Sequence, residues 1–311
     1  MPAEYVLTVR NLKKVFYGKT PFEAVKGISF DLQKGEILGL LGANGAGKTT
    51  TIQMLLSTLK PTSGSIVYFG KDFFAHRSEI LNKVAFASTY VSLPWKLTLE
   101  QNLKVFGRLY GLSDEDIRFA DTLLERFGIL HKKKMPLAKL SAGQVTRLML
   151  AKAFMIHPQI VLLDEPTASL DPDVAKDVLQ FVLEQRDRHG ISILYTSHNM
   201  AEVAEVCDRV LFMKNGKIIA DDLPERLAKS VGICKVTLQV GDGMKRTLSI
   251  AQALNLSCKT EHRSIAFDLD EEQIAILLSV LAQAGVIYTH IEIRQPTLED
   301  YFLHSALEEK L

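Results

Sequence analysis

Short apolar runs alternate with helical patterns through the first 230 residues or so, and this alternation predicts an α/β fold. Strands are predicted at 36–42, 160–164, 191–196 and 209–213. The runs beginning at 160 and 191 are apolar on both faces, as strands buried in a parallel sheet must be. Between Leu97 and about Gly128 the spacing becomes helical, which predicts an inserted helical subdomain over about 90–140.

The pattern changes near residue 231 and stays different to the end of the chain. Alternating apolar and polar residues predict strands at 236–240, 265–269 and about 291–293, and apolar residues at helical spacing predict a helix over 274–281. We therefore expect two domains: 1–230, and a small α+β domain at 231–311.

The composition is that of an ordinary globular protein, with 47% apolar and 23% charged residues in a chain of 311. The 37 basic and 36 acidic side chains leave a formal charge of +1, so no nucleic acid is expected as a partner. Three cysteines lie far apart, which fits a reducing cytoplasm and argues against a zinc site. No run reaches the ~18 apolar residues of a membrane span, and the first residues lack the apolar core of a signal peptide.

The stretch 42–50, GANGAGKTT, follows one predicted strand and opens a predicted helix, which is the setting of a phosphate-binding P-loop. Glycines let an anion reach backbone N–H groups, and the positive end of the helix dipole points to the same place. Lys48 would bridge the β- and γ-phosphates of ATP, and the Thr49 hydroxyl would bind Mg²⁺. The residues expected to bind ATP here are Gly42, Asn44, Gly45, Gly47, Lys48, Thr49 and Thr50.

Two carboxylates, Asp164 and Glu165, end the apolar strand at 160–164. Doubly wound sheets bind their ligands at such carboxyl ends. We expect Asp164 to hold Mg²⁺, directly or through water, and Glu165 to polarise the attacking water as general base. A surface turn would explain an isolated Asp-Glu pair, but the buried strand and the nearby P-loop favour the catalytic interpretation.

Residues 140–144, LSAGQ, resemble the LSGGQ signature loop of ATP-binding-cassette (ABC) proteins, with Ala142 in place of a glycine. Other motifs of that family follow in its usual order over about residues 5–230: Tyr17, which would stack on adenine, the D-loop Ser169-Leu170-Asp171, and the switch histidine His198. Taken singly, Tyr17 would fit a packed edge aromatic equally well, and His198 a structural histidine. The resemblance implies an α/β P-loop ATPase with a mixed sheet core, an antiparallel β part and a helical subdomain.

The signature loop of this family does not serve the ATP of its own chain; it closes on the γ-phosphate that a partner subunit holds. Ser141, Ala142, Gly143 and Gln144 lie next to a helix predicted at 145–156, whose N-terminus makes a second anion site. The resemblance therefore implies a head-to-tail homodimer or heterodimer with two ATP molecules between the subunits. His198 would contact the γ-phosphate and orient the water with Glu165, and Asp171 would couple the two sites.

One motif of the family is missing. A glutamine that touches Mg²⁺ and the attacking water normally follows the strand predicted here at 84–87. The sequence continues Ser88-Thr89-Tyr90, so Thr89 falls nearest to that position, although a shift of one residue would place Ser88 there. Because a hydroxyl is shorter than an amide, we expect hydrolysis to be slow or differently arranged.

The segment 196–210 and the ending PTLEDYF at 296–302 resemble ATPase subunits of ABC-2-type exporters. This resemblance implies an integral membrane permease as partner and a peripheral place on the cytoplasmic face of a bacterial inner membrane. Trp95 lies where such subunits receive a helix of the permease, so it either anchors that partner or fills the core of the helical subdomain. Thr297, followed by Asp300, also predicts the start of a last helix through a variant of the capping box.

Three other classes of ATP-binding protein are alternatives to the exporter. A soluble cassette ATPase of the ribosome would carry two cassettes, and a chromosome-maintenance ATPase would carry a long heptad insertion, and the sequence shows neither. A nucleotide-sensing module with little hydrolysis is the alternative that the missing glutamine favours.

Overall fold

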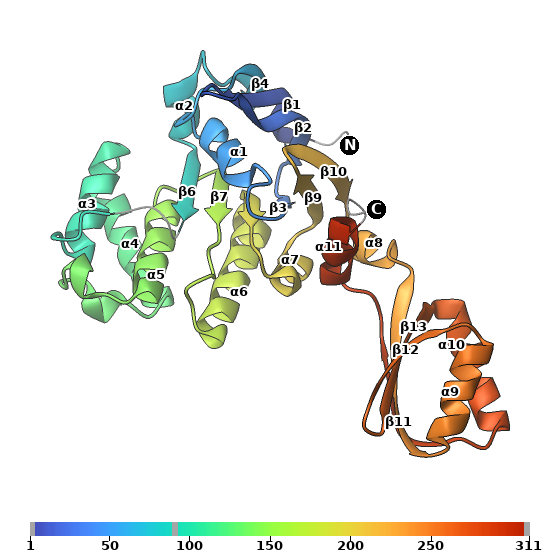
Figure 1. The fold of residues 1–311 in the computed structure, drawn as a ribbon. Helices are drawn as coiled ribbons and strands as arrows, with labels where there is room; N and C mark the ends of the chain where they lie inside the picture. Colours follow the sequence, from blue (N-terminus) through green and yellow to red (C-terminus); the bar gives the residue numbers. More distant parts are fainter. Residues whose placement is uncertain (1–3, 89–92, 308–311) are drawn as a thin grey trace. The chain divides into compact units, whose positions relative to one another are not determined.

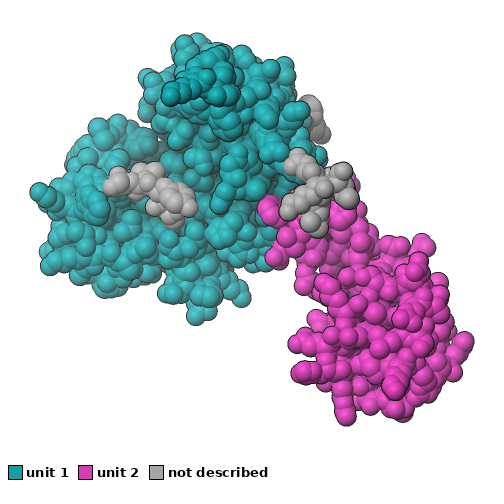
Figure 2. Space-filling model, in the orientation of Figure 1, with its two compact units in different colours: residues 1–224 teal, residues 225–311 magenta. Residues whose placement is uncertain are grey.

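The computed structural model describes residues 4–88 and 93–307, and it divides the chain into two compact units, 1–224 and 225–311 (Figures 1 and 2). Each unit has its own hydrophobic core, as a domain must. The division assigns helix α8 (Pro224–Lys229) almost wholly to the second unit, whereas the boundary expected from the sequence places it in the first. No helix in the described part of the chain is long and apolar enough to cross a membrane.

A six-stranded sheet forms the centre of the first unit, in the order β10-β9-β3-β8-β7-β6 (Figure 1). Its strands are β3 (Ile37–Leu41), β6 (Val84–Ser88), β7 (Ile160–Asp164), β8 (Ser192–Thr196), β9 (Arg209–Lys214) and β10 (Lys217–Asp222). β10 pairs antiparallel with β9, and the others pair in parallel. Every residue of β3, β7 and β8 is buried, which confirms the prediction that β7 and β8 are buried strands of a parallel sheet.

A second, antiparallel sheet in the same unit has the order β2-β1-β4-β5. Its strands are β1 (Tyr5–Phe16), β2 (Phe22–Gln33), β4 (Ser63–Tyr68) and β5 (Lys71–Asp72). Helix α1 (Lys48–Leu55) follows β3 directly, and one apolar cluster joins it to both sheets. Because α1 packs against both sheets, the position of the loop between β3 and α1 is fixed by the apolar core.

Helices α3 (Leu99–Leu109), α4 (Asp114–Arg126) and α5 (Ala142–Phe154) form the predicted helical subdomain (Figure 1). Each begins at a capping box, in which Thr98 pairs with Gln101, Ser113 with Asp116, and Ser141 with Gln144. Helix α5 therefore starts at residue 142 and not at the predicted 145, because Ser141 already caps it. Two short 3₁₀ helices, Leu130–Lys132 and Leu137–Lys139, lie between α4 and α5.

Helix α6 (Pro172–His189) packs on the helical subdomain through aromatic side chains. The Phe181 ring meets those of Phe127 and Phe154 edge-on, with ring centroids 4.8 and 4.9 Å away. Helices α2 (Arg77–Leu81) and α7 (Met200–Val206) are short; α2 precedes β6 and α7 connects β8 to β9.

The second unit is the small α+β domain that the sequence predicts. Its antiparallel sheet has the order β12-β13-β11-β14, with bounds β11 (Ile233–Asp242), β12 (Ser257–Glu261), β13 (Ser264–Asp270) and β14 (Ile287–Arg294). Helices α9 (Met244–Ala253) and α10 (Glu271–Gln283) share a core with the apolar residues of β11 and β13. Helix α11 (Leu298–Leu307) follows Thr297, whose hydroxyl accepts a hydrogen bond of 3.3 Å from the Asp300 N–H, so the predicted cap is confirmed.

Candidate functional site

Three glycines shape the loop between β3 and α1. Gly42, Gly45 and Gly47 have φ angles of 147°, 81° and 107°, a region that side chains with a Cβ rarely adopt. A Cβ on Gly42 would lie 2.2 Å from the Met213 carbonyl oxygen, and a Cβ on Gly47 would lie 2.7 Å from that of Ala24. The close approach of neighbouring backbone therefore requires glycine at 42 and 47, independently of any ligand.

Lys48 is the first residue of α1, and its ammonium group reaches back over the loop. The Nζ atom donates to the carbonyl oxygens of Gly42 at 2.7 Å and Ala43 at 3.3 Å. Burial lowers the pKa of Lys48, while the charges of Glu165 and Asp164 act in the opposite direction. Both hydrogen bonds end on neutral oxygens, so they leave a net positive charge at the helix N-terminus, which suits an anion.

The other P-loop residues lie open to solvent or partly so. Asn44, Gly45 and Thr49 are exposed, and Thr50 is half-buried. A Cβ on Gly45 would meet nothing within 4 Å, which leaves free space above the loop. Thr51, which the sequence reasoning did not single out, is buried and donates a 2.9 Å bond to the Gly47 carbonyl oxygen, so it helps to fix the loop.

Asp164 lies at the carboxyl end of β7 and is 7% exposed. Its Oδ1 accepts a hydrogen bond of 2.7 Å from the Thr196 hydroxyl, and its Oδ2 accepts one of 3.3 Å from the Ser88 hydroxyl. Asp164 is paired with both residues in the sheet register, since all three end neighbouring strands. The sequence reasoning missed Thr196, because nothing in a sequence shows which strands are neighbours.

Glu165 follows Asp164 in a left-handed conformation, with φ 54°, which a residue other than glycine adopts only at some cost. Its N–H donates to the Thr196 carbonyl oxygen at 3.1 Å, which holds the turn. The Glu165 side chain is 14% exposed, and its Oε2 lies 2.7 Å from Nδ1 of His198 and 3.3 Å from the His198 backbone nitrogen. The structure thus brings Glu165 and His198 into direct contact, although 33 positions separate them in the chain.

The signature loop packs against the D-loop within the same chain. Ser141 caps α5, and a Cβ on Gly143 would lie 2.9 Å from the Ser169 carbonyl oxygen. Ala142 is exposed in the first turn, so its methyl group costs nothing in packing. Asp171 is the N-cap residue of α6, but its side chain makes no cap hydrogen bond.

The structure does not bring every predicted residue to one place. No hydrogen bond or ion pair in the described part of the chain joins residues 42–50 to the signature loop 141–144. Tyr17 is 79% exposed and Trp95 is 68% exposed, so neither is a packed aromatic. Of the two alternatives for Trp95, the one in which it fills the subdomain core is wrong. Thr89 lies outside the described residues.

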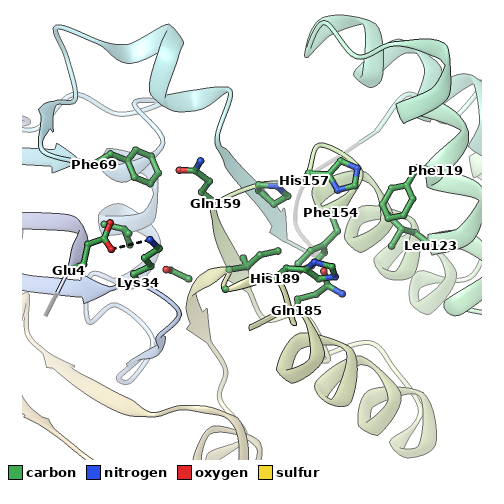
Figure 3. A pocket seen from close by; sticks show the side chains of 15 residues that line it. Glu4, Lys34, Phe69, Phe119, Leu123, Phe154, His157, Gln159, Gln185 and His189 are labelled. Atoms are coloured by element: carbon green, nitrogen blue, oxygen red, sulfur yellow. Dashed lines mark hydrogen bonds and ion pairs between the residues drawn. The ribbon is translucent and has the colours of Figure 1, made fainter. Parts of the chain in front are cut away.

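A cleft of about 610 Å³ opens at the opposite edge of the central sheet, where β7 and β8 begin (Figure 3). Phe119 and Phe154 line it together with His157, and the ion pair of Glu4 with Lys34 lies at its rim. None of its lining residues belongs to the motifs described above. The cleft is therefore separate from the candidate site, which is formed at the carboxyl ends of the strands.

Comparisons of the sequence with known proteins agree with this geometry. The family model described as ABC transporter matches residues 25–168. The bacitracin transport ATP-binding protein BcrA of Bacillus licheniformis is 30% identical over 283 residues, covering 90% of this chain and 92% of that protein. The linearmycin resistance ATP-binding protein LnrL of Bacillus subtilis is 31% identical, covering 96% and 97%. The Nod factor export ATP-binding protein I of Ralstonia nicotianae is 33% identical, covering 96% and 92%.

Solved structures resemble this fold. One described as the ATP binding subunit of an ABC transporter matches with a TM-score of 0.67 at 28% identity, covering 73% of this chain and 93% of that chain. A dimeric ATP-binding cassette in a post-hydrolysis state, bound to ADP and Pi, matches with a TM-score of 0.65 at 21% identity, covering 70% and 98%. Because the second structure is only 21% identical to this chain, its likeness shows the fold alone.

Proposed function

The chain belongs to the ABC transporter family, and we propose that it is the subunit that binds and hydrolyses ATP to power a membrane exporter of the ABC-2 type. The single observation that carries the hydrolytic part is the contact of His198 with Glu165, beside the buried carboxylate of Asp164. The transport part is supported by relatives whose names include bacitracin transport and Nod factor export and which match over nearly their whole length.

The triphosphate of ATP would lie against the glycine loop. Backbone N–H groups at the start of α1 offer donors to its oxygens, and the space above Gly45 admits it. The Lys48 ammonium, now bonded to two carbonyl oxygens, would turn to the β- and γ-phosphates. The exposed ring of Tyr17 is free to stack on adenine.

Mg²⁺ fits the oxygen donors present, which are the Thr49 hydroxyl and the Asp164 carboxylate. This ion is commonly held by one or two protein oxygens together with substrate phosphates and water. The described residues contain no group of three or more His, Cys, Asp or Glu that could hold a metal ion by themselves. When bound, Mg²⁺ would neutralise charge on the phosphates. Ser88 and Thr196 hold the Asp164 carboxylate in place for it.

Glu165 is the general base of the proposed reaction. Its carboxylate is largely shielded from solvent and is held by the His198 backbone N–H and imidazole. A base that is fixed in this way can take a proton from water as the water attacks the γ-phosphate. The imidazole, which is 75% exposed, is then within reach of the same phosphate and helps to orient the water.

A second cassette would complete the site, since residues 141–144 make no hydrogen bond or ion pair to the P-loop of their own chain within the described residues. We propose a head-to-tail dimer, with this chain or a related one as the second subunit, in which each signature loop meets the γ-phosphate on the other subunit. The capped N-terminus of α5 offers free backbone N–H groups for that contact. Asp171, which makes no cap bond, is available to reach across the interface.

The permease would contact the helical subdomain, with the chain lying peripherally on the cytoplasmic face of the membrane. Trp95 supports this arrangement, because a tryptophan exposed to 68% suits an anchor in a protein interface. Val105 and Leu109 on α3 are also exposed, at 44% and 74%, and supply further apolar surface on the same subdomain.

A nucleotide-sensing module is the second candidate. The observation in its favour is the threonine at position 89, where the family has a glutamine. A glutamine at this position would contact Mg²⁺ and the attacking water through its side-chain amide, and threonine has no such amide. In a sensing module, ATP binding would persist while turnover would be negligible.

Phosphate release by the purified chain separates the two candidates. We expect release that requires Mg²⁺ and that falls about 100-fold or more in Glu165→Gln, because the amide cannot accept the proton. ATP affinity of the variant should stay within about twofold of the parent, as the P-loop is untouched. Glu205→Gln on the exposed side of α7 is the matched control and should keep parental turnover. A parent chain that binds ATP without releasing phosphate would favour the sensing module.

A further inference from the structure

The Glu202 carboxylate collects hydrogen bonds from four side chains near the candidate site. Its Oε2 accepts from the hydroxyls of Thr167 at 2.6 Å, Tyr195 at 3.2 Å and Ser197 at 3.2 Å. Its Oε1 accepts from Nδ2 of Asn199 at 3.1 Å. Thr167, Tyr195 and Ser197 are buried, so these bonds lie largely out of water, where a charged acceptor is held strongly.

Three of the four donors belong to the two turns that carry the proposed catalytic pair, and the fourth, Tyr195, lies in β8. Thr167 lies two residues after Glu165, and Ser197 and Asn199 lie on either side of His198. Asn199 also caps α7, accepting from the backbone nitrogens of residues 201 and 202, and its own N–H donates to the Ser197 hydroxyl at 3.0 Å. Glu202 therefore links the turn after β7 to the turn after β8 through hydrogen bonds to side chains of both turns.

We propose that Glu202 is a positioning residue for ATP hydrolysis, fixing the His198 turn against the Glu165 turn; this rests on the function proposed above. The reason is the exposure of the imidazole. With 75% of its side chain in solvent, His198 is not held by packing, so its orientation depends on its backbone and on its one bond to Glu165. The Glu202 network fixes that backbone on both sides.

Both carboxylate oxygens of Glu202 matter, as well as the size of the side chain. An amide at this position has one oxygen and one NH₂ group. If the oxygen faced the three hydroxyls, the NH₂ group would face the NH₂ group of Asn199, whose oxygen is already used to cap α7. Glu202→Gln therefore keeps the volume and loses at least one bond of the network.

The test compares Glu202→Gln with the exposed neighbour Glu205→Gln. We expect Glu202→Gln to lower kcat about 10- to 100-fold, which is the effect of a small misplacement of catalytic groups, and to leave the KM for ATP within about twofold. Glu205→Gln should match the parent. Combined with His198→Ala, Glu202→Gln should cause little further loss of kcat, since both changes act on the same group.

Thr167 provides a second variant in case Glu202→Gln does not fold. Thr167→Ser keeps the hydroxyl and should keep parental kcat, whereas Thr167→Val removes it and should lower kcat. If the network had a merely structural role, Thr167→Ser and Thr167→Val would lose thermal stability and activity to the same extent. The losses of kcat in Glu202→Gln and His198→Ala would then multiply in the double variant. Parental kcat in Glu202→Gln, or either of those patterns, would overturn the proposal.

NMR of the His198 ring gives a readout that does not need hydrolysis. Its resonances should shift in Glu202→Gln and stay in place in Glu205→Gln; an unmoved ring would contradict the positioning role. A parent chain that releases no phosphate would count against the proposed function, while the ring resonances would still decide the role of Glu202.

Discussion

At the scale of the residue, the site depends on where single charges are held. The Lys48 ammonium is partly buried, and burial lowers its pKa, yet its bonds reach only carbonyl oxygens. Burial makes such a cation costly in the free protein, and the charges of Glu165 and Asp164 offset this cost only in part. Asp164 shows the converse arrangement, since both of its oxygens accept hydroxyl bonds and hold its negative charge in place.

Removing the Lys48 charge should weaken nucleotide binding without unfolding the chain. We expect Lys48→Ala to lower ATP affinity about 10- to 100-fold, the size of a lost hydrogen bond to a charged group. Titration with a fluorescent ATP analogue measures the change. Lys34→Ala, which removes an exposed lysine paired with Glu4, is the control and should bind as the parent does. Equal affinity of Lys48→Ala and the parent would refute the P-loop assignment.

At the scale of the element, α5 is placed by a contact that is possible only for glycine. The Gly143 Cα hydrogen faces the Ser169 carbonyl oxygen, and a Cβ there would lie at 2.9 Å. A side chain larger than a hydrogen at position 143 would therefore push the D-loop away from the signature loop or shift α5. Ala142, next to it, points to solvent, which explains how the alanine is tolerated where the family has glycine.

Gly143→Ala should separate these two loops. We expect turnover to fall about tenfold, in the range of effects that misplaced catalytic groups produce. ATP binding by the isolated chain should be unchanged, because no hydrogen bond or ion pair among the described residues links the signature loop to the P-loop. Ala142→Gly is the matched control, one position away and exposed, and should stay near parental turnover. Steady-state phosphate release and ATP titration of both variants provide the measurement. Parental turnover in Gly143→Ala would show that the contact yields without consequence.

Sequence patterns predicted the elements well where the spacing of apolar residues and the residue types at the ends of a run indicated the same element. The buried strands β3, β7 and β8 were predicted because their apolar runs are short and bounded by turn residues. The start of α5 was predicted three residues late, although Ser141 and Gln144 already form the capping signal. The alternating strands β1 and β2 were not delimited from the sequence, since several register shifts interrupt their pairing.

At the scale of the whole molecule, the proposed ATP sandwich needs a second subunit. The P-loop and the signature loop of one chain make no bond to each other among the described residues. The structure also decides where a cross-link can be placed. A cysteine at Gly47 would collide with the Ala24 carbonyl oxygen, whereas Asn44 and Ala142 are both exposed.

Copies with Asn44→Cys should cross-link to copies with Ala142→Cys when ATP is bound. The Glu165→Gln background should stabilise the pair, because it keeps the ATP uncleaved. Native Cys258, which is partly exposed, is first replaced by serine. Gel electrophoresis after mild oxidation gives the yield, and Lys48→Ala in the same background should abolish it. A yield that is the same with and without ATP would argue against the sandwich of two identical chains.

The sequence by itself determined the chemistry: the glycine loop with Lys48, the carboxylates after an apolar strand, and the signature residues 141–144 all follow from local residue types at fixed spacing. Only the tertiary structure decided which of these groups meet. It placed Ser88, Asp164 and Thr196 side by side, brought His198 to Glu165, and gathered four donors around Glu202. The physical reason is that strand order and register bring together residues that are far apart in the chain, and no local pattern encodes those pairings.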